Sequence, residues 1–419
     1  MVTGMREMKD SGVEWVGLIP KDWIKTRVQF IGRFINGYAF KLENWGDEGL
    51  PIIRIQDLTG NNDNPNYYAG KIDNKYRVVS GDILISWAAT LAAFRWNKGD
   101  AWLNQHIFKA IPNKEIVNSN FFFWLMNLAM NNMNNGNKHG IMMQHVTADI
   151  FNKFPVCLPQ IPEQKRIAAF LDAKCAEIDA LSADIQSEIE TLEAYRRSVI
   201  TEAVTKGLDK NAPTKDSGIE WVGEIPTTWD VKKGKYCLRY VQKPTKPDDD
   251  VITCFRDGEV TLRKNRREEG FTISLKEIGY QGIDVGDLIV HGMDGFAGAI
   301  GISDSRGKAS PVLNVLDTDN NKRYIMYYLR SLAFNGVFLA LSTGIRVRTC
   351  DTNWGKLREL LYVLPPKKEQ DDIVRFIDER LNATDEIIAQ KQEQLAVLAD
   401  YKKSIIYEYV TGKKEVPVA

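Results

Sequence analysis

Apolar residues return every seven positions in two long segments of the chain. The first series is Leu171, Ile178, Ile185, Leu192 and Val199, with Leu181 and Ile189 widening the stripe. The second is Val374, Leu381, Ile388 and Leu395, flanked by Ile377, Leu398 and Ile405, with Thr384 and Lys391 interrupting that flank. A repeat kept over about four heptads is typical of a coiled-coil seam. Two amphipathic helices that each pack on their own domain are the alternative.

Prolines and glycines predict where these two helices begin and end. Pro159 and Pro162 precede the first segment and Gly207 follows it, whereas Pro365 and Pro366 precede the second and Gly412 follows it. Each helix would have ~44 residues and a length of roughly 65 Å. Because both lie in one chain, they can pair antiparallel about a pseudo-twofold axis.

The segments before each helix predict mixed α/β blocks. Short apolar runs at 51–55, 83–85, 288–290 and 360–364 are typical of strands. Gly81-Asp82 and Gly286-Asp287 precede two of these runs, and such a pair favours a turn that enters a strand. The apolar run at 121–126 indicates a buried helix.

A long motif occurs twice. The segment 9–17, Lys-Asp-Ser-Gly-Val-Glu-Trp-Val-Gly, returns at 215–223 with isoleucine for the first valine, at an offset of 215 − 9 = 206. The same offset relates Trp23 to Trp229 and Glu163-Gln164 to Glu369-Gln370. A repeat of this length indicates a whole module used twice. By contrast, segments 86–90 and 291–295 differ greatly, which suggests one scaffold that carries two different surfaces.

The predicted fold class is therefore α+β, with two mixed α/β domains joined by two long antiparallel coiled-coil helices in a pseudo-twofold internal repeat. The expected boundaries are 1–160 for the first domain, 161–210 for the central helix, 211–365 for the second domain and 366–419 for the distal helix.

The charge is balanced overall but not along the chain. Lys and Arg number 55, as do Asp and Glu. Residues 24–157 carry 14 − 10 = +4 and residues 231–361 carry 21 − 16 = +5, whereas 162–206 and 367–413 carry 6 − 9 = −3 and 8 − 10 = −2. Two mildly basic blocks fit two separate polyanion contacts. The five scattered cysteines, and the lack of a leader or a long apolar run, predict a cytoplasmic protein that contacts no membrane.

Motifs for catalysis are weak. Asn64-Pro65-Asn66-Tyr67 resembles an amino-methyltransferase motif, but it follows a loop and lacks the second proline, so a turn is favoured. Gly295, Gly298 and Gly301 favour bends within a hairpin over a nucleotide loop. The four histidines show no metal-ligand spacing.

Side chains suited to nucleic-acid contact lie at matched positions in the two halves. Two glycine-led loops, at 138–145 and 343–349, can place polar side chains against base edges, and the basic run at 263–267 suits phosphate contact. Solvated loops and a charged face are the alternative. The candidate DNA-binding residues are Lys138, His139, Gln144, His145, Arg263, Arg266, Arg267, Thr343, Arg346 and Arg348, with Arg54 and Gln56 as further candidates.

The whole chain resembles the specificity subunit of type I restriction–modification systems. The features that carry the resemblance are the repeated motif, the Glu-Gln pair at the start of each long helix, and the helix tails at Tyr195 and Tyr401. The resemblance implies a subunit without catalysis whose two domains each read one half of a bipartite, asymmetric double-stranded DNA site, with the helices setting the gap. It implies two modification (methyltransferase) subunits and restriction (translocase/nuclease) subunits as partners. S-adenosylmethionine, ATP and Mg are then expected on the partners, and no cofactor on this chain.

Two other functions are compatible with the residues alone. One is a fused DNA methyltransferase or nuclease, which the missing cofactor loop disfavours. The other is a coiled-coil protein-interaction scaffold that does not read DNA.

Overall fold

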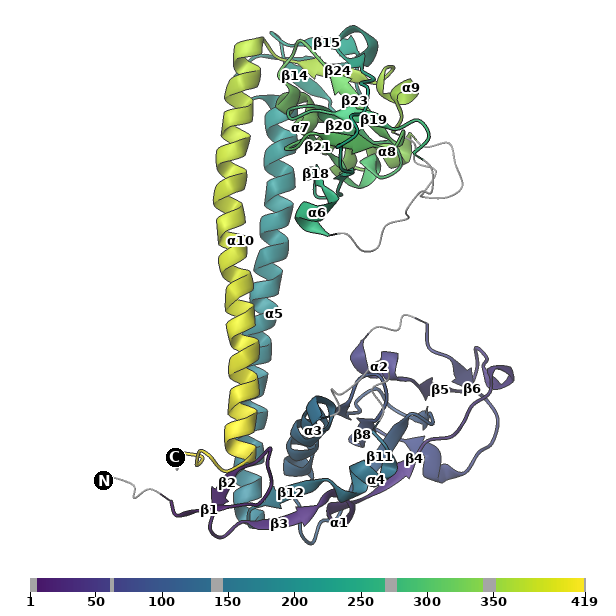
Figure 1. Cartoon of the computed structure of the whole chain (residues 1–419), viewed down its shortest axis with the longest axis vertical. Coiled ribbons are helices and arrows are strands. Elements are labelled where there is room, and N and C mark those ends of the chain that lie inside the picture. The colour runs from purple at the N-terminus through teal and green to yellow at the C-terminus, as the bar shows by residue number, and fades with distance from the viewer. Residues whose placement is uncertain (1–5, 61–63, 137–145, 268–276, 342–351, 418–419) are drawn as a thin grey trace. The chain divides into compact units, whose positions relative to one another are not determined.

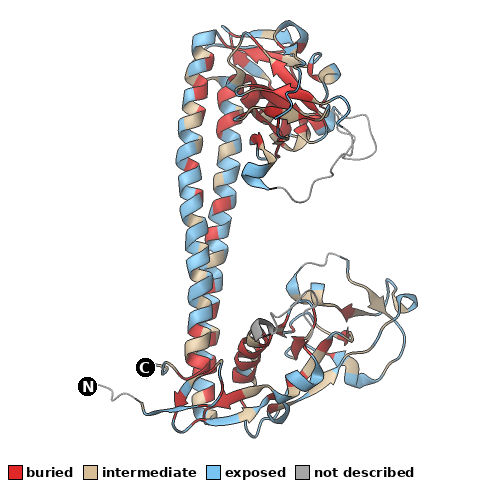
Figure 2. Ribbon diagram, viewed as in Figure 1, coloured by how far each residue is buried: buried red, intermediate tan, exposed pale blue. Residues whose placement is uncertain are grey.

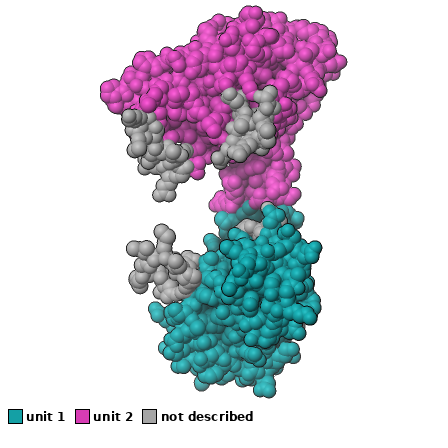
Figure 3. All heavy atoms as spheres, turned by 90° about the vertical axis from the view of Figure 1, so that its right-hand side faces the viewer, with its two compact units in different colours: residues 1–184, 394–419 teal, residues 185–393 magenta. Residues whose placement is uncertain are grey.

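The computed structural model of the chain describes all residues except 1–5, 61–63, 137–145, 268–276, 342–351 and 418–419. It divides into two compact units. Unit 1 comprises 1–184 and 394–419, and unit 2 comprises 185–393 (Figure 3). Each unit therefore contains one α/β block and a stretch of both long helices, so the units do not follow the order of the sequence.

The repeated motif folds into the same hairpin in both units. In unit 1, β1 (Met8–Asp10) pairs antiparallel with β2 (Leu18–Pro20); in unit 2, β13 (Thr214–Asp216) pairs with β14 (Glu224–Pro226). The Asp-Ser-Gly sequence explains the turn. Gly12 has φ +61°, its amide donates to Asp10 Oδ1 at 2.9 Å, and Ser11 Oγ accepts from Val13 N at 3.0 Å. Gly218 has φ +67° in the equivalent turn.

Unit 1 contains two four-stranded sheets (Figure 1). An antiparallel sheet has the order β4 (Gly32–Asn36), β11 (Ile107–Pro112), β8 (Ile83–Ser86) and β9 (Ala92–Arg95). A mixed sheet has the order β6 (Tyr67–Tyr68), β5 (Leu50–Ile53), β10 (Ala101–Leu103) and β7 (Arg77–Val78). β3 (Ile24–Arg27) pairs with β12 (Pro155–Leu158). The helices of this block are α1 (Val28–Ile31), α2 (Ile55–Thr59), α3 (Ser119–Gly136) and α4 (Ala148–Lys153).

Unit 2 repeats the first of these sheets. The order is β16 (Arg239–Tyr240), β23 (Leu313–Asp317), β20 (Leu288–His291) and β21 (Ile300–Ile302), all antiparallel. β15 (Asp230–Lys233) pairs with β24 (Leu361–Leu364), as β3 does with β12. The smaller sheets are β17 (Ile252–Cys254) with β18 (Val260–Leu262) and β19 (Gln281–Ile283) with β22 (Gly307–Ala309). The helices are α6 (Arg263–Arg266), α7 (Lys322–Phe334), α8 (Val337–Ala340) and α9 (Trp354–Leu357).

The strand predictions hold with one local correction. The turns before β8 and β20 form as expected, since Gly81 and Gly286 have φ +98° and +84°. The run at 51–55, however, is not one strand: β5 ends at Ile53 and α2 begins at Ile55. The physical reason is the Asp57 carboxylate, which accepts the Arg54 amide at 2.7 Å and so favours a helix start. The glycines at 295–301 lie in a hairpin between β20 and β21, as predicted.

The two long helices are α5 (Ile161–Lys206) and α10 (Lys367–Val410), with 46 and 44 residues. Within each unit they run antiparallel. In unit 1 the Lys402 ammonium is 2.5 Å from Asp179, and in unit 2 the Arg196 guanidinium is 3.1 Å from Asp385. Both helices end before a glycine in the left-handed region, Gly207 at φ +74° and Gly412 at φ +71°.

The seam of the helix pair differs from the prediction at one position. Figure 2 shows buried residues recurring along both helices, and they include Leu171, Ile178 and Ile185. Leu181, which we expected to widen the stripe, is 49% exposed. Cys175 is buried in the seam instead, at 3% exposed. Seam positions alternate in steps of four and three residues, so a seam that begins at Leu171 continues at 175 and 178 and does not include 181.

The hairpins anchor the blocks to the helices through two equivalent tryptophans. Trp23 and Trp229 are fully buried. Trp23 Nε1 donates to Glu163 at 3.2 Å, and Trp229 Nε1 donates to Glu369 at 3.0 Å. The repeated motif and the Glu at each helix start are therefore two parts of one contact, formed once in each unit.

Candidate nucleic-acid interface

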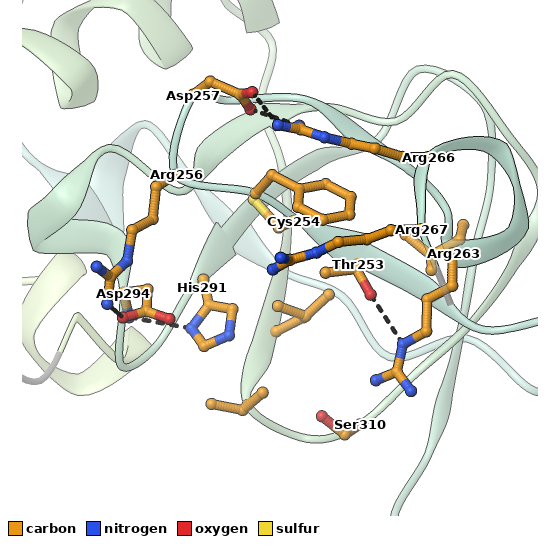
Figure 4. Close-up of a pocket in the computed structure, with 14 residues that line it drawn as sticks. Thr253, Cys254, Arg256, Asp257, Arg263, Arg266, Arg267, His291, Asp294 and Ser310 are labelled. Atoms are coloured by element: carbon orange, nitrogen blue, oxygen red, sulfur yellow. Dashed lines mark hydrogen bonds and ion pairs between the residues drawn. The ribbon is translucent and has the colours of Figure 1, made fainter. Parts of the chain in front are cut away.

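A pocket of about 590 Å³ opens in unit 2 where the basic run meets the end of β20 (Figure 4). Four arginines and two aspartates line it: Arg256, Arg263, Arg266, Arg267, Asp257 and Asp294. Cations therefore exceed carboxylates by 4 − 2 = 2 among its lining residues. A concave surface with this charge suits a polyanion.

The basic run predicted from the sequence forms the single-turn helix α6, with Arg267 directly after it. Arg266 bonds both Asp257, at 2.6 Å, and Glu259, at 2.7 Å. Its guanidinium also lies 4.1 Å from the ring centroid of Phe255. Arg266 is thus held mainly by its own domain, and its first role is to position α6.

Arg263 and Arg267 have different surroundings in the same pocket. Arg263 Nε donates to Thr253 Oγ1 at 3.0 Å, which fixes the plane of the guanidinium. Arg267 lies 5.9 Å from the Phe255 centroid, and Figure 4 shows it extending across the pocket. A guanidinium held in one plane suits bidentate bonding to a guanine edge or to a phosphate.

His291 stands opposite these arginines at the end of β20. Its Nδ1 accepts two backbone amides, from Met293 at 3.2 Å and from Asp294 at 3.0 Å. Burial is the main cause that lowers the pKa of His291 below its usual value, and the Asp294 carboxylate opposes that effect. Arg256 pairs with Asp294 at 2.8 Å and so reduces the opposition.

Unit 1 has a smaller pocket of about 200 Å³, lined by Arg54, Ile55, Gln56, Asn104, His106 and Ile107. The two outlying candidates of the sequence analysis, Arg54 and Gln56, are therefore brought together with a histidine and an asparagine. The Arg54 guanidinium lies 4.9 Å from the Trp45 ring centroid, and Gln56 is exposed. Guanidinium and amide groups are the side chains that bond guanine and adenine edges.

The candidates Lys138, His139, Gln144, His145, Thr343, Arg346 and Arg348 lie outside the described residues. The residues that follow these two segments take equivalent places. Val146 N donates to Trp87 O at 3.3 Å, just after β8, and Thr352 N donates to Gly292 O at 2.8 Å, just after β20. Both segments therefore rejoin the fold at the same point of the repeated sheet.

Sequence reasoning missed Arg256, His291 and Asp294 in one pocket and Asn104 and His106 in the other. Segment 291–295 differs from its counterpart at 86–90, but no sequence pattern assigns a role to the histidine. Its neighbours in space, Arg263 and Arg267, are more than 20 positions away in the chain, and no local pattern links them.

No cluster of metal-ligating side chains occurs among the described residues. The four cysteines that the structure describes are free. None of the helices in the described ranges is both long and apolar enough to cross a membrane.

Comparison with known proteins gives a consistent result. Residues 20–191 match the family described as Type I restriction modification DNA specificity domain. The Type I restriction enzyme EcoBI specificity subunit of Escherichia coli is 24% identical over 437 residues, which cover 97% of this chain and 90% of the relative. The putative type I restriction enzyme MjaX specificity subunit of Methanocaldococcus jannaschii is also 24% identical, and the match covers 96% of both chains.

A solved structure supports the fold. A chain from a structure titled as the basis of complex assembly and conformational transition of the type I R-M system has a TM-score of 0.66 at 15% identity. The match covers 94% of this chain and 99% of that one. The predicted α+β fold with long helices is thereby confirmed. The matched family is one of DNA specificity domains and the relatives are specificity subunits, which supports the predicted non-catalytic subunit.

Proposed function

Because the chain is a specificity subunit of the type I restriction–modification kind, we propose that it reads a bipartite, asymmetric DNA site, with one half-site for each α/β block. We call these blocks recognition domains 1 and 2, in units 1 and 2. One observation carries the proposal: the two blocks share one sheet, but the pockets beside it have different linings. Arg54, Gln56 and His106 line one, and four arginines with His291 line the other.

The chemistry of the two pockets suits base edges with phosphate support. Arg54 and Gln56 offer donors of the type that bond guanine and adenine in the major groove, and a good bidentate pair contributes about 1–3 kcal/mol of discrimination. Arg263 and Arg267 suit a guanine or a phosphate. The net charge of zero implies that the partner subunits supply much of the remaining phosphate affinity.

We further propose that α5 and α10 set the gap between the half-sites. Each helix is continuous from one unit into the other, with no proline between Pro162 and Lys206 or after Pro366 in α10. Adding seven residues lengthens a helix by about 10.5 Å and leaves the phase of its seam unchanged. A matched heptad inserted in both helices should therefore change the permitted gap but not the half-sites.

The proposed partners are two copies of a modification subunit, joined by restriction subunits, which carry S-adenosylmethionine, ATP and Mg. Exposed apolar side chains on the helices support two equal contacts. Leu181 and Tyr401 are 49% and 53% exposed in unit 1, and their equivalents at offset 206, Ile387 and Tyr195, are 43% and 46% exposed in unit 2.

Leu181 and Ile387 face away from the grooves that the helices form with the recognition domains. Asp179 lines a groove in unit 1 together with α3 residues such as Phe123, and Asp385 pairs with Arg196, which lines the equivalent groove in unit 2. Leu181 and Ile387 follow the two aspartates by two residues, and two residues turn an α-helix by about 200°. One partner helix could pack on each patch, which accounts for two copies.

Methylome sequencing of cells that express this chain with its modification partner tests the proposal. We expect one methylated motif made of two unlike halves separated by a fixed gap. Methylation of the cell's own DNA would also agree with the predicted cytoplasmic location. A single unbroken motif would contradict two half-site readers. No methylation, combined with no DNA footprint of the assembled complex, would favour the protein-interaction scaffold instead.

A further inference from the structure

We infer that His291 is a specificity-determining residue that donates a hydrogen bond from Nε2 to an acceptor on one base of the half-site read by recognition domain 2. The inference rests on the proposed function and adds to it a residue, an atom and a direction of hydrogen bonding. A donor at Nε2 excludes cytosine at the base position that His291 reads, because cytosine presents a donor in the major groove and not an acceptor.

The backbone fixes which ring nitrogen carries the proton. Nδ1 accepts the amides of Met293 and Asp294 at 3.2 and 3.0 Å, so it cannot also hold a proton while these bonds exist. A neutral imidazole must then be protonated at Nε2. That nitrogen is a donor and cannot act as an acceptor.

The position of the ring is as well defined as its tautomer. His291 ends β20, a strand with a partner on each side, and its amide donates to Ala299 O at 3.0 Å. Its carbonyl accepts Thr352 Oγ1 at 2.7 Å. Figure 4 shows the ring nitrogen opposite Nδ1 on the side where Arg267 and Arg263 lie. A donor held in this way costs little entropy when a base binds.

The charged neighbours support a reading role over a purely structural one. Asp294 is occupied by Arg256 at 2.8 Å, and Asp257 by Arg266 at 2.6 Å, so the two carboxylates of the pocket are neutralised within the domain. A base edge can then approach His291 without meeting an unpaired negative charge, and Arg263 and Arg267 can hold the neighbouring phosphates or bases.

Two substitutions separate the donor from the loop anchor. In His291→Asn the side-chain oxygen can take the place of Nδ1 and accept the two amides, but no donor reaches the position of Nε2. In His291→Gln the amide nitrogen reaches the position of Nε2, whereas the anchor is lost. We expect His291→Asn to relax one position of the second half-site by roughly tenfold and to leave the first half-site unchanged, and His291→Gln to keep the wild-type preference.

The assay uses the assembled methyltransferase and oligonucleotides with every base at every position of the second half-site. Association with the modification subunit and the thermal midpoint of each complex control for folding. If wild type methylates a bipartite site but His291→Asn keeps its preference, the inference is wrong and the proposed function stands. Uniform weakening across all sequences would also overturn it, because that is the effect of a phosphate contact.

A chemical substitution in the DNA tests the same bond with the wild-type protein. The acceptor is removed in turn by 7-deazapurine at each purine, by 2-aminopurine (which lacks O6) at each guanine and by a thymine analogue without O4 at each thymine. One position should lose roughly tenfold in methylation with wild type and lose nothing further with His291→Asn. If no substitution that weakens wild type becomes neutral in His291→Asn, the bond does not exist. If wild type shows no bipartite preference, the proposed function itself fails.

Discussion

Replacing the buried glutamine at the start of each long helix should loosen one recognition domain at a time. Gln164 is fully buried: its Oε1 accepts Asn118 N at 2.7 Å, and its Nε2 donates to Ile116 O at 3.0 Å and Pro159 O at 2.8 Å. It therefore ties the start of α5 to the segment that begins α3.

The equivalent residue of unit 2 makes the same kind of contact. Gln370 is 1% exposed; it accepts Asn321 N at 2.9 Å and donates to Asn320 Oδ1 at 3.0 Å and Pro365 O at 2.9 Å. Methionine has a similar shape without the polar atoms, so Gln→Met isolates the hydrogen bonds from the packing.

The magnitude follows from the groups left without a partner. Gln164→Met removes the partner of one N–H and two carbonyls, of which the Pro159 carbonyl is buried and the other two groups are partly buried. An unmet buried group costs about 1–3 kcal/mol and a partly exposed one less, so we expect a loss of about 2–4 kcal/mol in the local free energy of opening. Gln186→Met, at an exposed position on α5, should change it by less than about 0.5 kcal/mol.

Hydrogen exchange followed by mass spectrometry measures this loss in each unit separately. Gln164→Met should speed exchange in peptides around Asn118, and Gln370→Met in peptides around Asn321, each without affecting the other. Rates within fivefold of wild type in both variants would refute the energetic reasoning, and equal acceleration in both units would refute the separate anchoring of the two domains.

Three further outcomes follow from the structure. Leu181→Ser combined with Tyr401→Ser should leave one modification subunit bound in place of two, measured by native mass spectrometry. Arg54→Ala should relax the first half-site only, measured by methylome sequencing. Lys243 and Arg239 are the main causes that lower the pKa values of Asp284 and Asp317, respectively, to about 2. The stabilisation of unit 2 by these carboxylates is therefore complete above about pH 4 and is lost as the pH falls through 2. Denaturant titrations at different pH values should show this loss of stability, and Asp284→Asn should make the loss smaller.

The sequence was most informative where the information is local or repeated. Heptad spacing alone predicted α5 and α10, because a coiled-coil seam needs only apolar residues at regular intervals. The repeat predicted equivalent hairpins, and the Asp-Ser-Gly turn follows from the positive φ that glycine permits. The prediction that Leu181 lies in the apolar stripe was wrong. Near Ile178 the sequence fits a stripe that contains either Leu181 or Cys175, and only the packing of the helices shows that Cys175 is the buried one.

The candidate interface was harder to predict because its parts come from distant segments. Arg263 and Arg267 were recognisable as a basic run, but the ion pairs that restrain Arg266 depend on the turn at Asp257 and Glu259. His291 acquires its defined donor from two backbone amides, a feature with no signature in the sequence.

The turn that follows α10 has a consequence for how genes of this kind can change. Lys413 Nζ donates to the carbonyls of Val16, at 2.6 Å, and Leu18, as Lys206 Nζ does to those of Val222 and Glu224 at 3.1 and 2.7 Å. The end of the chain meets the first hairpin as the end of α5 meets the second. If each recognition domain reads one half-site, as proposed, a chain made of one repeat would complete itself with a second copy and read two identical half-sites. Recombination within the repeated motif would then exchange one half-site and preserve the other.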